Sequence, residues 1–456
     1  MSEKYTEAEV CMVLDTYMYF NYYDAPDGIR LKDVINSMSQ EMIDTHPNEY
    51  AVLKDAVNSP QLGDLRIRYQ AQQLGYNSGT NAVTFVNKDF DKVYVAYRGT
   101  YDGEWYDNGQ GLIKEQTAQQ REAVKYFDEV VEHLNIDDTT ELYTTGHSKA
   151  GNKVQYVTMD SKYSDKITAT YSVDGQGHSE AAINRWKNAY TKEEYDKRVG
   201  KIYAINGEND FISVLGNSIV LASHVSYVAT PVDKFNIAKY HDITGMFYKP
   251  GDGKNPATYT GKRNSYVLKR GTFANTIAKL SESVMKMNPG KREHSANTLM
   301  QLVESVNGGL KTGLNGEKAS ILDFASFYQE GIPIILSNIF LTSEGNSFLK
   351  DIVFNDGFAD TVDCDCIVDV NYLSLRALAE EMDNTSKSMG RILAELGTMG
   401  AAVPLYFDGY SYRRPHIENS VVKLMNEKNK LRRISQVECE ISRLYEEFDN
   451  MVFELG

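Results

Sequence analysis

A serine between a short apolar segment and a helical one constrains the fold of this chain more than any other feature. The segment at 141–151 reads Glu-Leu-Tyr-Thr-Thr-Gly-His-Ser-Lys-Ala-Gly. A serine on a sharp strand-to-helix turn needs small residues two positions away on either side, because the strand and the helix otherwise collide. Gly146 meets this need, and Ala150 replaces the usual second glycine, with Gly151 directly after it. The pattern predicts a strand–turn–helix unit with the serine at its tip, although such a turn also arises by chance.

The place of this serine predicts its chemistry. Backbone N–H groups at the N-terminus of a helix face any negative charge that develops there. A serine held at that point can attack a carbonyl carbon, and the next backbone N–H can bind the oxyanion that forms. Ser148 is therefore a candidate nucleophile, and the backbone N–H of Lys149 is a candidate oxyanion donor.

Strand-like and helix-like segments alternate over the first 265 residues. The predicted elements are helices at 6–20, 118–134 and 150–161 and strands at 82–86, 92–97, 141–145, 167–173 and 201–205. Alternation of this kind favours a parallel sheet covered by helices. We therefore expect an α/β domain at 1–265, followed by an all-helical region.

A second motif ends the predicted strand at 92–97. Val-Ala-Tyr-Arg-Gly-Thr occupies 95–100, and Trp105 follows. This motif resembles the oxyanion strand of the class 3 lipases, and residues 143–152 resemble their nucleophile elbow. The lysine and asparagine after the serine, a tyrosine-rich N-terminal helix and Ser-Val-Asp-Gly-Gln-Gly at 172–177 are similar to a bacterial, lipase-like branch of that superfamily.

The resemblance extends over residues 5–250 and carries several implications. It implies an α/β-hydrolase fold, with Thr100 as the second oxyanion donor and no metal or cofactor. It also implies an acyl ester substrate, either a glycerolipid or a phospholipid, by analogy with the family.

The acid should follow the serine in this fold, and the base should follow the acid. Asp210 comes just after the predicted strand at 201–205, where a carboxylate reaches the same sheet edge as Ser148, and it matches the family's acid. Asp174 and Glu208 are the alternatives. Asp174 also follows a strand, but a glycine-rich turn explains it more simply.

Four histidines come later in the chain: His224, His241, His294 and His416. His241 stands in a loop context, and its segment at 239–243 resembles the family's base segment. His224 lies within an apparent strand at 220–227, where we expect it to pack.

Two earlier histidines are weaker candidates for the base. His147 adjoins the serine and is expected to be structural, and His178 is a weaker candidate than His241. The predicted triad is Ser148 as nucleophile, His241 as base and Asp210 as acid.

Composition excludes other classes of protein. The formal net charge of −15 repels nucleic acid and anionic lipid at long range. Four cysteines, two of them in a lone Cys-x-Cys at 364–366, are too few for a disulfide framework or a zinc site. The N-terminus has no apolar leader, and the longest apolar run is too short to span a bilayer. We expect a protein made in the cytoplasm without a transmembrane segment, and secreted, if at all, by a leaderless route.

Helical patterns dominate the rest of the chain. We expect a helical connecting region at 266–370 and a helical hairpin at 371–456, formed by helices at 371–396 and 415–455. Apolar residues of the last helix recur at steps of three, four or seven, which gives a stripe about 60 Å long. The hairpin is either a cap on the hydrolase or an interaction module that small helical partner proteins complete.

The hairpin distantly resembles the helical targeting domains of LXG-type toxins of type VII secretion, with the order of enzyme and targeting helices reversed. That resemblance implies a secreted lipase effector. The expected function is a serine ester hydrolase of the lipase or phospholipase A type. Two alternatives stay open: a non-catalytic lipid- or protein-binding module on a hydrolase scaffold, and a thioesterase or peptidase with the same triad.

Overall fold

The computed structural model describes residues 5–20, 25–76, 80–101, 104–230, 237–249, 258–259, 262–306, 311–313 and 316–318. The chain divides into two units, Met1–Val353 and Phe354–Gly456, and every described residue belongs to the first. The predicted hairpin at 371–456 lies outside the described residues. No helix among the described residues is both long enough and apolar enough to cross a membrane.

The strands are β1 (Arg66–Gln70), β2 (Ala82–Val86), β3 (Lys92–Tyr97), β4 (Glu141–His147), β5 (Ile167–Val173), β6 (Ile202–Gly207), β7 (Val225–Val228), β8 (Tyr248–Lys249), β9 (Thr258–Tyr259) and β10 (Tyr266–Val267). The helices are α1 (Glu7–Tyr17), α2 (Leu31–Asn36), α3 (Gln40–Thr45), α4 (Pro47–Ala56), α5 (Pro60–Gly63), α6 (Trp105–Gly111), α7 (Ala118–His133), α8 (Lys149–Asp160), α9 (Glu180–Ala189), α10 (Lys192–Val199), α11 (Thr272–Met285) and α12 (Pro289–Val306). Short 3-10 helices include η1 (Met18–Phe20), η5 (Ala222–His224), η6 (Ile237–His241) and η7 (Ile243–Phe247).

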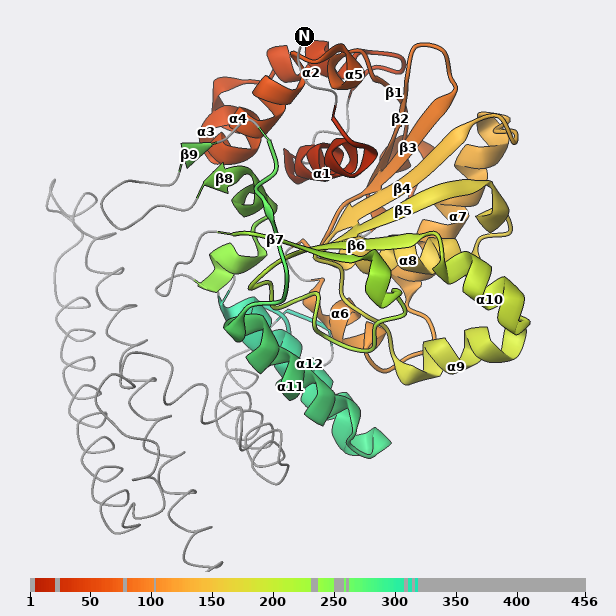
Figure 1. The fold of residues 1–456 in the computed structure, drawn as a ribbon, viewed down its shortest axis with the longest axis vertical. Helices are drawn as coiled ribbons and strands as arrows, with labels where there is room; N and C mark the ends of the chain where they lie inside the picture. The colour runs from red at the N-terminus through yellow and green to blue at the C-terminus, as the bar shows by residue number, and fades with distance from the viewer. Residues whose placement is uncertain are drawn as a thin grey trace, which may run out of the picture. The chain divides into compact units, whose positions relative to one another are not determined.

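Within the described part of the chain, eight strands form one mixed sheet in the order β1-β2-β3-β4-β5-β6-β7-β10 (Figure 1). Neighbours from β3 to β7 run parallel, whereas β1, β2 and β10 add antiparallel strands at the two edges. Parallel neighbours need crossover connections, and helices supply them: α7 joins β3 to β4, α8 joins β4 to β5, and α9 and α10 join β5 to β6.

The sheet separates two apolar clusters, because successive side chains of a strand point to opposite faces. In β3, Tyr94 and Ala96 belong to the cluster that contains α1, whereas Val93 and Val95 belong to the cluster that contains α7 and α8. Figure 1 shows α1 across one face of the sheet and α7 and α8 against the other. Because β3, β4, β5 and β6 run parallel, their carboxyl ends all lie at the same edge of the sheet.

The predicted elements of the first 265 residues correspond closely to these. β2, β3 and β5 have the predicted bounds, and α7 and α8 begin within one residue of theirs. The predicted α/β-hydrolase fold is confirmed. Two helices of the predicted connecting region, α11 and α12, pack together, and α12 lies against α6.

The predicted strand around His224 is wrong in its bounds. Residues 222–224 form η5, and β7 begins only at Val225. The His224 ring stacks on Tyr203 at 4.2 Å between centroids, and its Nδ1 lies 3.1 Å from the Ile202 carbonyl oxygen. These contacts with β6 hold His224 in the turn that precedes the strand.

Candidate active site

Ser148 occupies the junction of β4 and α8 in an unusual backbone conformation. Its φ is 64° and its ψ is −128°. A positive φ is uncommon for a residue other than glycine, and such strain is concentrated at functional sites. The Ser148 N–H donates to the Val173 carbonyl at 2.9 Å, so the neighbouring strand helps to hold the turn.

Glycines permit the close approach that this turn requires. A Cβ added at Gly146 would lie 2.5 Å from the Cβ of Ala150, and one at Gly151 would lie 2.5 Å from the Cα of Gly175. Neither neighbour can move without displacing backbone. The backbone is therefore packed so closely beside the serine that only small residues fit, as the sequence predicts.

The structure brings Ser148, His241 and Asp210 together from three separate elements. His241 Nε2 lies 2.7 Å from Ser148 Oγ, and His241 Nδ1 lies 2.6 Å from Asp210 Oδ1. The second oxygen of Asp210 accepts the Ser213 N–H at 2.6 Å. Asp210 is fully buried. A nucleophile that contacts a base, and a base that a third group orients, form the arrangement used in nucleophilic catalysis.

The alternative acids occupy other positions. Asp174 follows β5, where one of its oxygens accepts the Gly207 N–H at 2.7 Å and the other lies 3.5 Å from His147 Nε2. Glu208 Oε1 lies 3.4 Å from the N–H of Thr230. Asp210 is thus the carboxylate that is hydrogen-bonded to the ring of His241.

The other candidate histidines have structural contacts. His178 is buried between Asn152 and Gln155, with each ring nitrogen 3.2 Å from one of their amide groups. Burial lowers the pKa of His178 to about 3. His147 stacks on His241 with 4.6 Å between ring centroids.

The candidate oxyanion donors flank the serine. Lys149 begins α8 directly after Ser148, and Thr100 follows β3, the neighbouring parallel strand. The Thr100 hydroxyl oxygen accepts the Asn108 side-chain N–H at 2.8 Å, which ties this residue to α6. Both residues therefore stand at the same sheet edge as the serine.

Sequence reasoning missed a role for the Lys149 side chain. This side chain is fully buried, and its Nζ donates to Asp107 Oδ2 at 2.6 Å and to the Asp107 carbonyl at 3.0 Å. One helical turn later, Lys153 donates to the Arg98 carbonyl at 3.2 Å. The two lysines hold the segment that carries Thr100 against α8. Their i, i+4 spacing in the sequence indicates that both side chains lie on the same face of the helix.

A hollow of about 300 Å³ opens beside the serine. Its lining residues are Tyr19, Glu49, Thr100, Tyr101, Trp105, His147, Ser148, His241, Asp242 and Ile243. Because it joins the nucleophile, the base and an oxyanion candidate to aromatic walls, it is the candidate substrate site.

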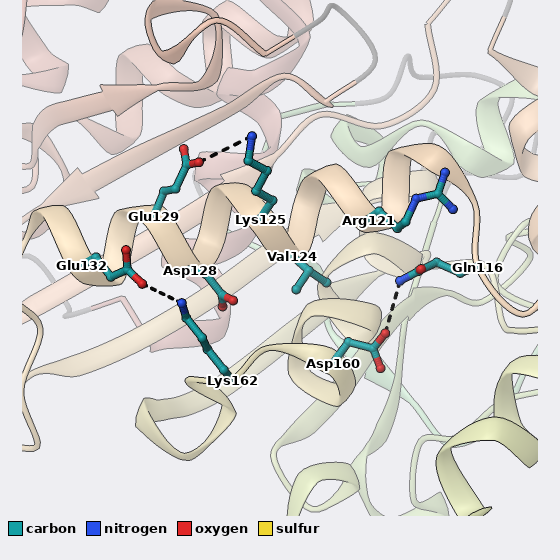
Figure 2. A pocket seen from close by; sticks show the side chains of 9 residues that line it. All are labelled: Gln116, Arg121, Val124, Lys125, Asp128, Glu129, Glu132, Asp160 and Lys162. Atoms are coloured by element: carbon teal, nitrogen blue, oxygen red, sulfur yellow. Dashed lines mark hydrogen bonds and ion pairs between the residues drawn. The ribbon is translucent and has the colours of Figure 1, made fainter. Parts of the chain in front are cut away.

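A larger hollow, of about 530 Å³, lies beside α7 and the end of α8 (Figure 2). Four of its charged side chains already pair with one another, Lys162 with Glu132 at 2.7 Å and Lys125 with Glu129 at 3.7 Å. Gln116 donates to Asp160 at 3.3 Å across the same hollow. This surface has neither a serine nucleophile nor a histidine in its lining, so size alone does not make it the site.

One group of buried side chains has metal-binding chemistry. His147, Asp174 and His241 offer donor atoms that all lie within 4.8 Å of one another. Both nitrogens of His241 are already engaged, by Asp210 and by Ser148. A metal there would break the hydrogen-bonded triad, so we assign none to the site.

Part of the chain matches a known protein family. Residues 56–225 match a family model described as Mbeg1-like, a range that includes Ser148 and Asp210 and ends before His241. The eight-stranded sheet with its helical crossovers is that of an α/β-hydrolase. No curated protein matches this chain.

Two solved structures are similar to parts of it. One is titled a fungal lipase and is 12% identical, with a TM-score of 0.30, over 55% of this chain and 88% of that one. The other, a triacylglycerol lipase from Penicillium expansum, is 11% identical, with a TM-score of 0.24, over 46% of this chain and 84% of that one. These TM-scores are too low to support a function.

Proposed function

We propose that the protein is a serine ester hydrolase that acts on acyl esters of lipids, as a lipase or phospholipase A does. The observation that carries the proposal is the continuous hydrogen-bonded chain from Ser148 through His241 to Asp210, built on a strained strand-to-helix turn. Structural ion pairs and buried histidines are common, but a serine at positive φ that contacts a carboxylate-oriented imidazole has a catalytic use.

The proposed mechanism follows from these contacts. His241 Nε2 takes the hydroxyl proton as Ser148 Oγ attacks the ester carbonyl carbon. Asp210 holds the Nδ1–H tautomer of His241 and stabilises the imidazolium that forms. The backbone N–H groups of Lys149 and Thr100 bind the oxyanion. His241 then protonates the leaving alcohol, and a water molecule, activated in the same way, hydrolyses the acyl-enzyme.

The substrate class rests on the lining of the hollow and on the resemblance of the two motifs to lipases. Tyr101, Trp105 and Ile243 offer apolar surface beside the nucleophile, which suits an acyl chain. An acyl ester of a lipid offers both a carbonyl carbon for Ser148 and an apolar chain for this surface. A thioester or a peptide bond would be attacked by the same triad, so substrates of each kind belong in the test.

The test is a hydrolysis panel of glycerolipids, phospholipids, a soluble ester, a thioester and a peptide. Ser148→Ala should lower kcat by about 10³-fold or more, because it removes the nucleophile. Ser218→Ala, at an exposed serine, is the matched control and should behave as the wild type. Full labelling of the Ser148→Ala protein by a fluorophosphonate probe would refute the assignment, and a wild type that hydrolyses nothing would favour the binding module.

A further inference from the structure

His147 has no step in the proposed mechanism, yet active-site groups enclose it. Its ring stacks on that of His241, with 4.6 Å between centroids and 27° between planes. Its Nδ1 is hydrogen-bonded to the hydroxyl of Tyr19, and its Nε2 lies 3.5 Å from Asp174 Oδ2. Only 3% of His147 and 1% of Asp174 is exposed.

The contact between His147 and Asp174 requires a proton. Among the described residues, neither His147 Nε2 nor Asp174 Oδ2 has a hydrogen-bond partner within ordinary range. The other oxygen of Asp174 accepts the Gly207 N–H at 2.7 Å. Two buried acceptors that face each other are unfavourable unless one of them carries a hydrogen. Three arrangements supply it: a protonated Asp174 donates to a neutral ring, a neutral ring with its hydrogen on Nε2 donates to an Asp174 carboxylate, or a cationic ring pairs with that carboxylate.

The surroundings favour a protonated, neutral Asp174 beside a neutral His147. Burial, and then the nearby Asp210, raise the pKa of Asp174 well above its usual range. Burial, and then His241, lower the pKa of His147. The charged or titratable groups that face this cluster from the packed elements are Asp15, Tyr19, Glu49, Asp210, His241 and Asp242. Four of these six are carboxyl groups, and Asp210 already supplies the negative charge that the base needs.

The tautomer of His147 follows from that proton. If Asp174 donates to Nε2, the hydrogen of the neutral ring is on Nδ1, and Nδ1 donates to the Tyr19 oxygen. Tyr19 comes from η1 and Asp174 from the end of β5, so the ring is fixed from two sides. The ring of His241 therefore stacks on a neutral His147 ring whose orientation is fixed.

We propose that Asp174, His147 and Tyr19 form a second hydrogen-bonded chain, in which Asp174 donates to His147 and His147 donates to Tyr19, and that this chain positions the His241 ring for proton transfer from Ser148. The inference rests on the proposed hydrolase function. A neutral His147 also leaves the His241 imidazolium without a like charge beside it during the reaction.

The same substitution at the two buried aspartates separates their roles. Asparagine reproduces a protonated Asp174, since its N–H donates to His147 and its oxygen accepts from Gly207, and it tolerates the φ of 47° at this position. Asp174→Ala should lower kcat about tenfold, and Asp174→Asn should restore it to within about threefold of the wild type. Asp210→Asn should lower kcat by about 10⁴-fold, because the His241 tautomer is then wrong.

The pH profile decides which partner carries the proton. If Asp174 is neutral, Asp174→Asn should leave the acid limb of kcat/KM in place. If Asp174 is a carboxylate, whether it pairs with a cationic His147 or accepts from a neutral one, the substitution removes a negative charge near His241. The acid limb would then move by about one pH unit, and that result would overturn the inference.

Tyr19→Phe tests the other end of the chain. Loss of the acceptor for Nδ1–H should lower kcat about tenfold with KM within about twofold of the wild type. Tyr163→Phe is the matched control, because that hydroxyl donates to Glu132 at 3.0 Å in an exposed contact. A wild-type kcat in Tyr19→Phe would rule out positioning through His147.

A readout that needs no activity keeps this inference separate from the proposed function. In the full-length chain with ¹⁵N-labelled histidine, His147 should give the spectrum of a neutral ring with its hydrogen on Nδ1 at pH 7, assigned by its loss in His147→Gln. An imidazolium signal, or a neutral ring with its hydrogen on Nε2, would overturn the second chain even in an active enzyme. Failure of hydrolysis in the wild type would overturn only the proposed function.

Discussion

Lys153 is the residue whose burial has the clearest consequence for pH. It is fully buried in α8, and burial lowers its pKa to about 7. In the unfolded chain a lysine has its ordinary pKa of 10.5. Between these two values the unfolded state binds more protons than the folded state, so the free energy of unfolding rises with pH across this window.

Lys153→Met should remove this rise. In the wild type the free energy of unfolding should increase from about pH 7 to about pH 10 by a few kcal/mol, at about 1.4 kcal/mol per pKa unit. The variant should therefore be more stable than the wild type near pH 7, with a difference that shrinks as the pH rises. Denaturant unfolding at several pH values measures it, with Lys197→Met as a control for loss of a surface lysine. Parallel curves for the wild type and Lys153→Met would contradict the prediction.

At the scale of elements, the contact of β4 with α8 sets how the serine is presented. Gly146→Ala places a Cβ 2.5 Å from Ala150, so the strand and the helix must separate. We expect a loss of about 1–3 kcal/mol in the free energy of unfolding and a lower kcat. Gly290→Ala in α12 is the matched change, because an added Cβ there meets nothing within 4 Å. Equal effects of the two substitutions on thermal melting and kcat would show that the contact at the turn is unimportant.

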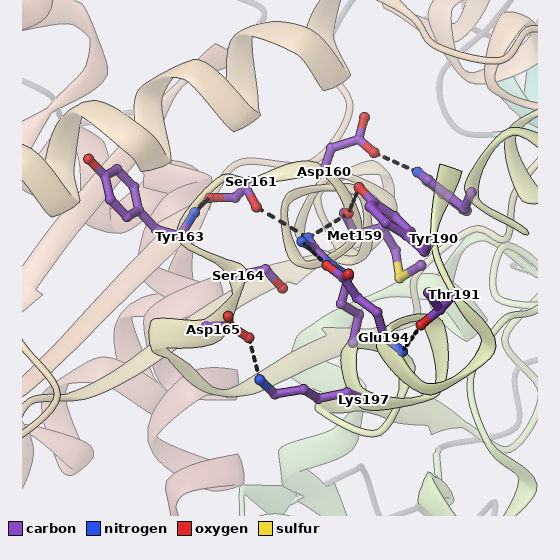
Figure 3. Close-up of polar contacts among 12 residues, drawn as sticks. Met159, Asp160, Ser161, Tyr163, Ser164, Asp165, Tyr190, Thr191, Glu194 and Lys197 are labelled. Atoms are coloured by element: carbon purple, nitrogen blue, oxygen red, sulfur yellow. Dashed lines mark hydrogen bonds and ion pairs between the residues drawn. The ribbon is translucent and has the colours of Figure 1, made fainter. Parts of the chain in front are cut away.

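The far end of α8 is held by a guanidinium group from α10. The last carbonyls of a helix lack partners within the helix, and Arg198 donates to the carbonyls of Met159 and Ser161 at 2.8 and 3.2 Å while pairing with Glu194 at 2.9 Å. Figure 3 shows these acceptors, together with Tyr190, whose hydroxyl also donates to the Met159 carbonyl. The helix that carries the candidate nucleophile at its start is thus fixed at both ends.

Arg198→Lys should destabilise the protein by about 1–3 kcal/mol, because an ammonium group cannot reproduce the planar fork. Lys192→Ala removes an ion pair with Asp196 in which both side chains are exposed, and it should cost less than about 1 kcal/mol. Chemical denaturation of both variants compares them directly. An Arg198→Lys protein as stable as the wild type would mean that α8 needs no such cap.

At the scale of the whole molecule, the candidate site and its supports all lie in the unit Met1–Val353. Removal of residues 371–456 should therefore spare hydrolysis of a soluble ester and abolish binding of the small helical partners that the hairpin predicts. Activity assays and pull-downs after co-expression check both parts, and a secretion assay checks the predicted leaderless export. If the deletion unfolds the hydrolase, and the isolated hairpin is a stable monomer without a partner, the hairpin is a structural cap.

The sequence alone determined the elements around the serine. Strand β3, the turn at 146–151 and helix α8 are specified by side-chain periodicity and by glycines at fixed offsets, and both signals are contained in short stretches of chain. The same local order indicated Ser148 and Asp210, because the carboxyl ends of parallel strands meet at one edge, whereas His241 was indicated by its loop context and by the resemblance of its segment to that of the class 3 lipases. Their roles in catalysis stay a proposal.

Only the tertiary structure decided which distant residues meet behind that edge. Tyr19 and His147 are 128 positions apart, and no periodicity relates them to each other or to Asp174. The burial of Lys149 against Asp107 and the place of His224 before β7 were equally beyond the sequence. The physical reason is that patterns along a chain report which face of an element is apolar, whereas a buried polar contact depends on how α1 and the crossovers pack onto the sheet.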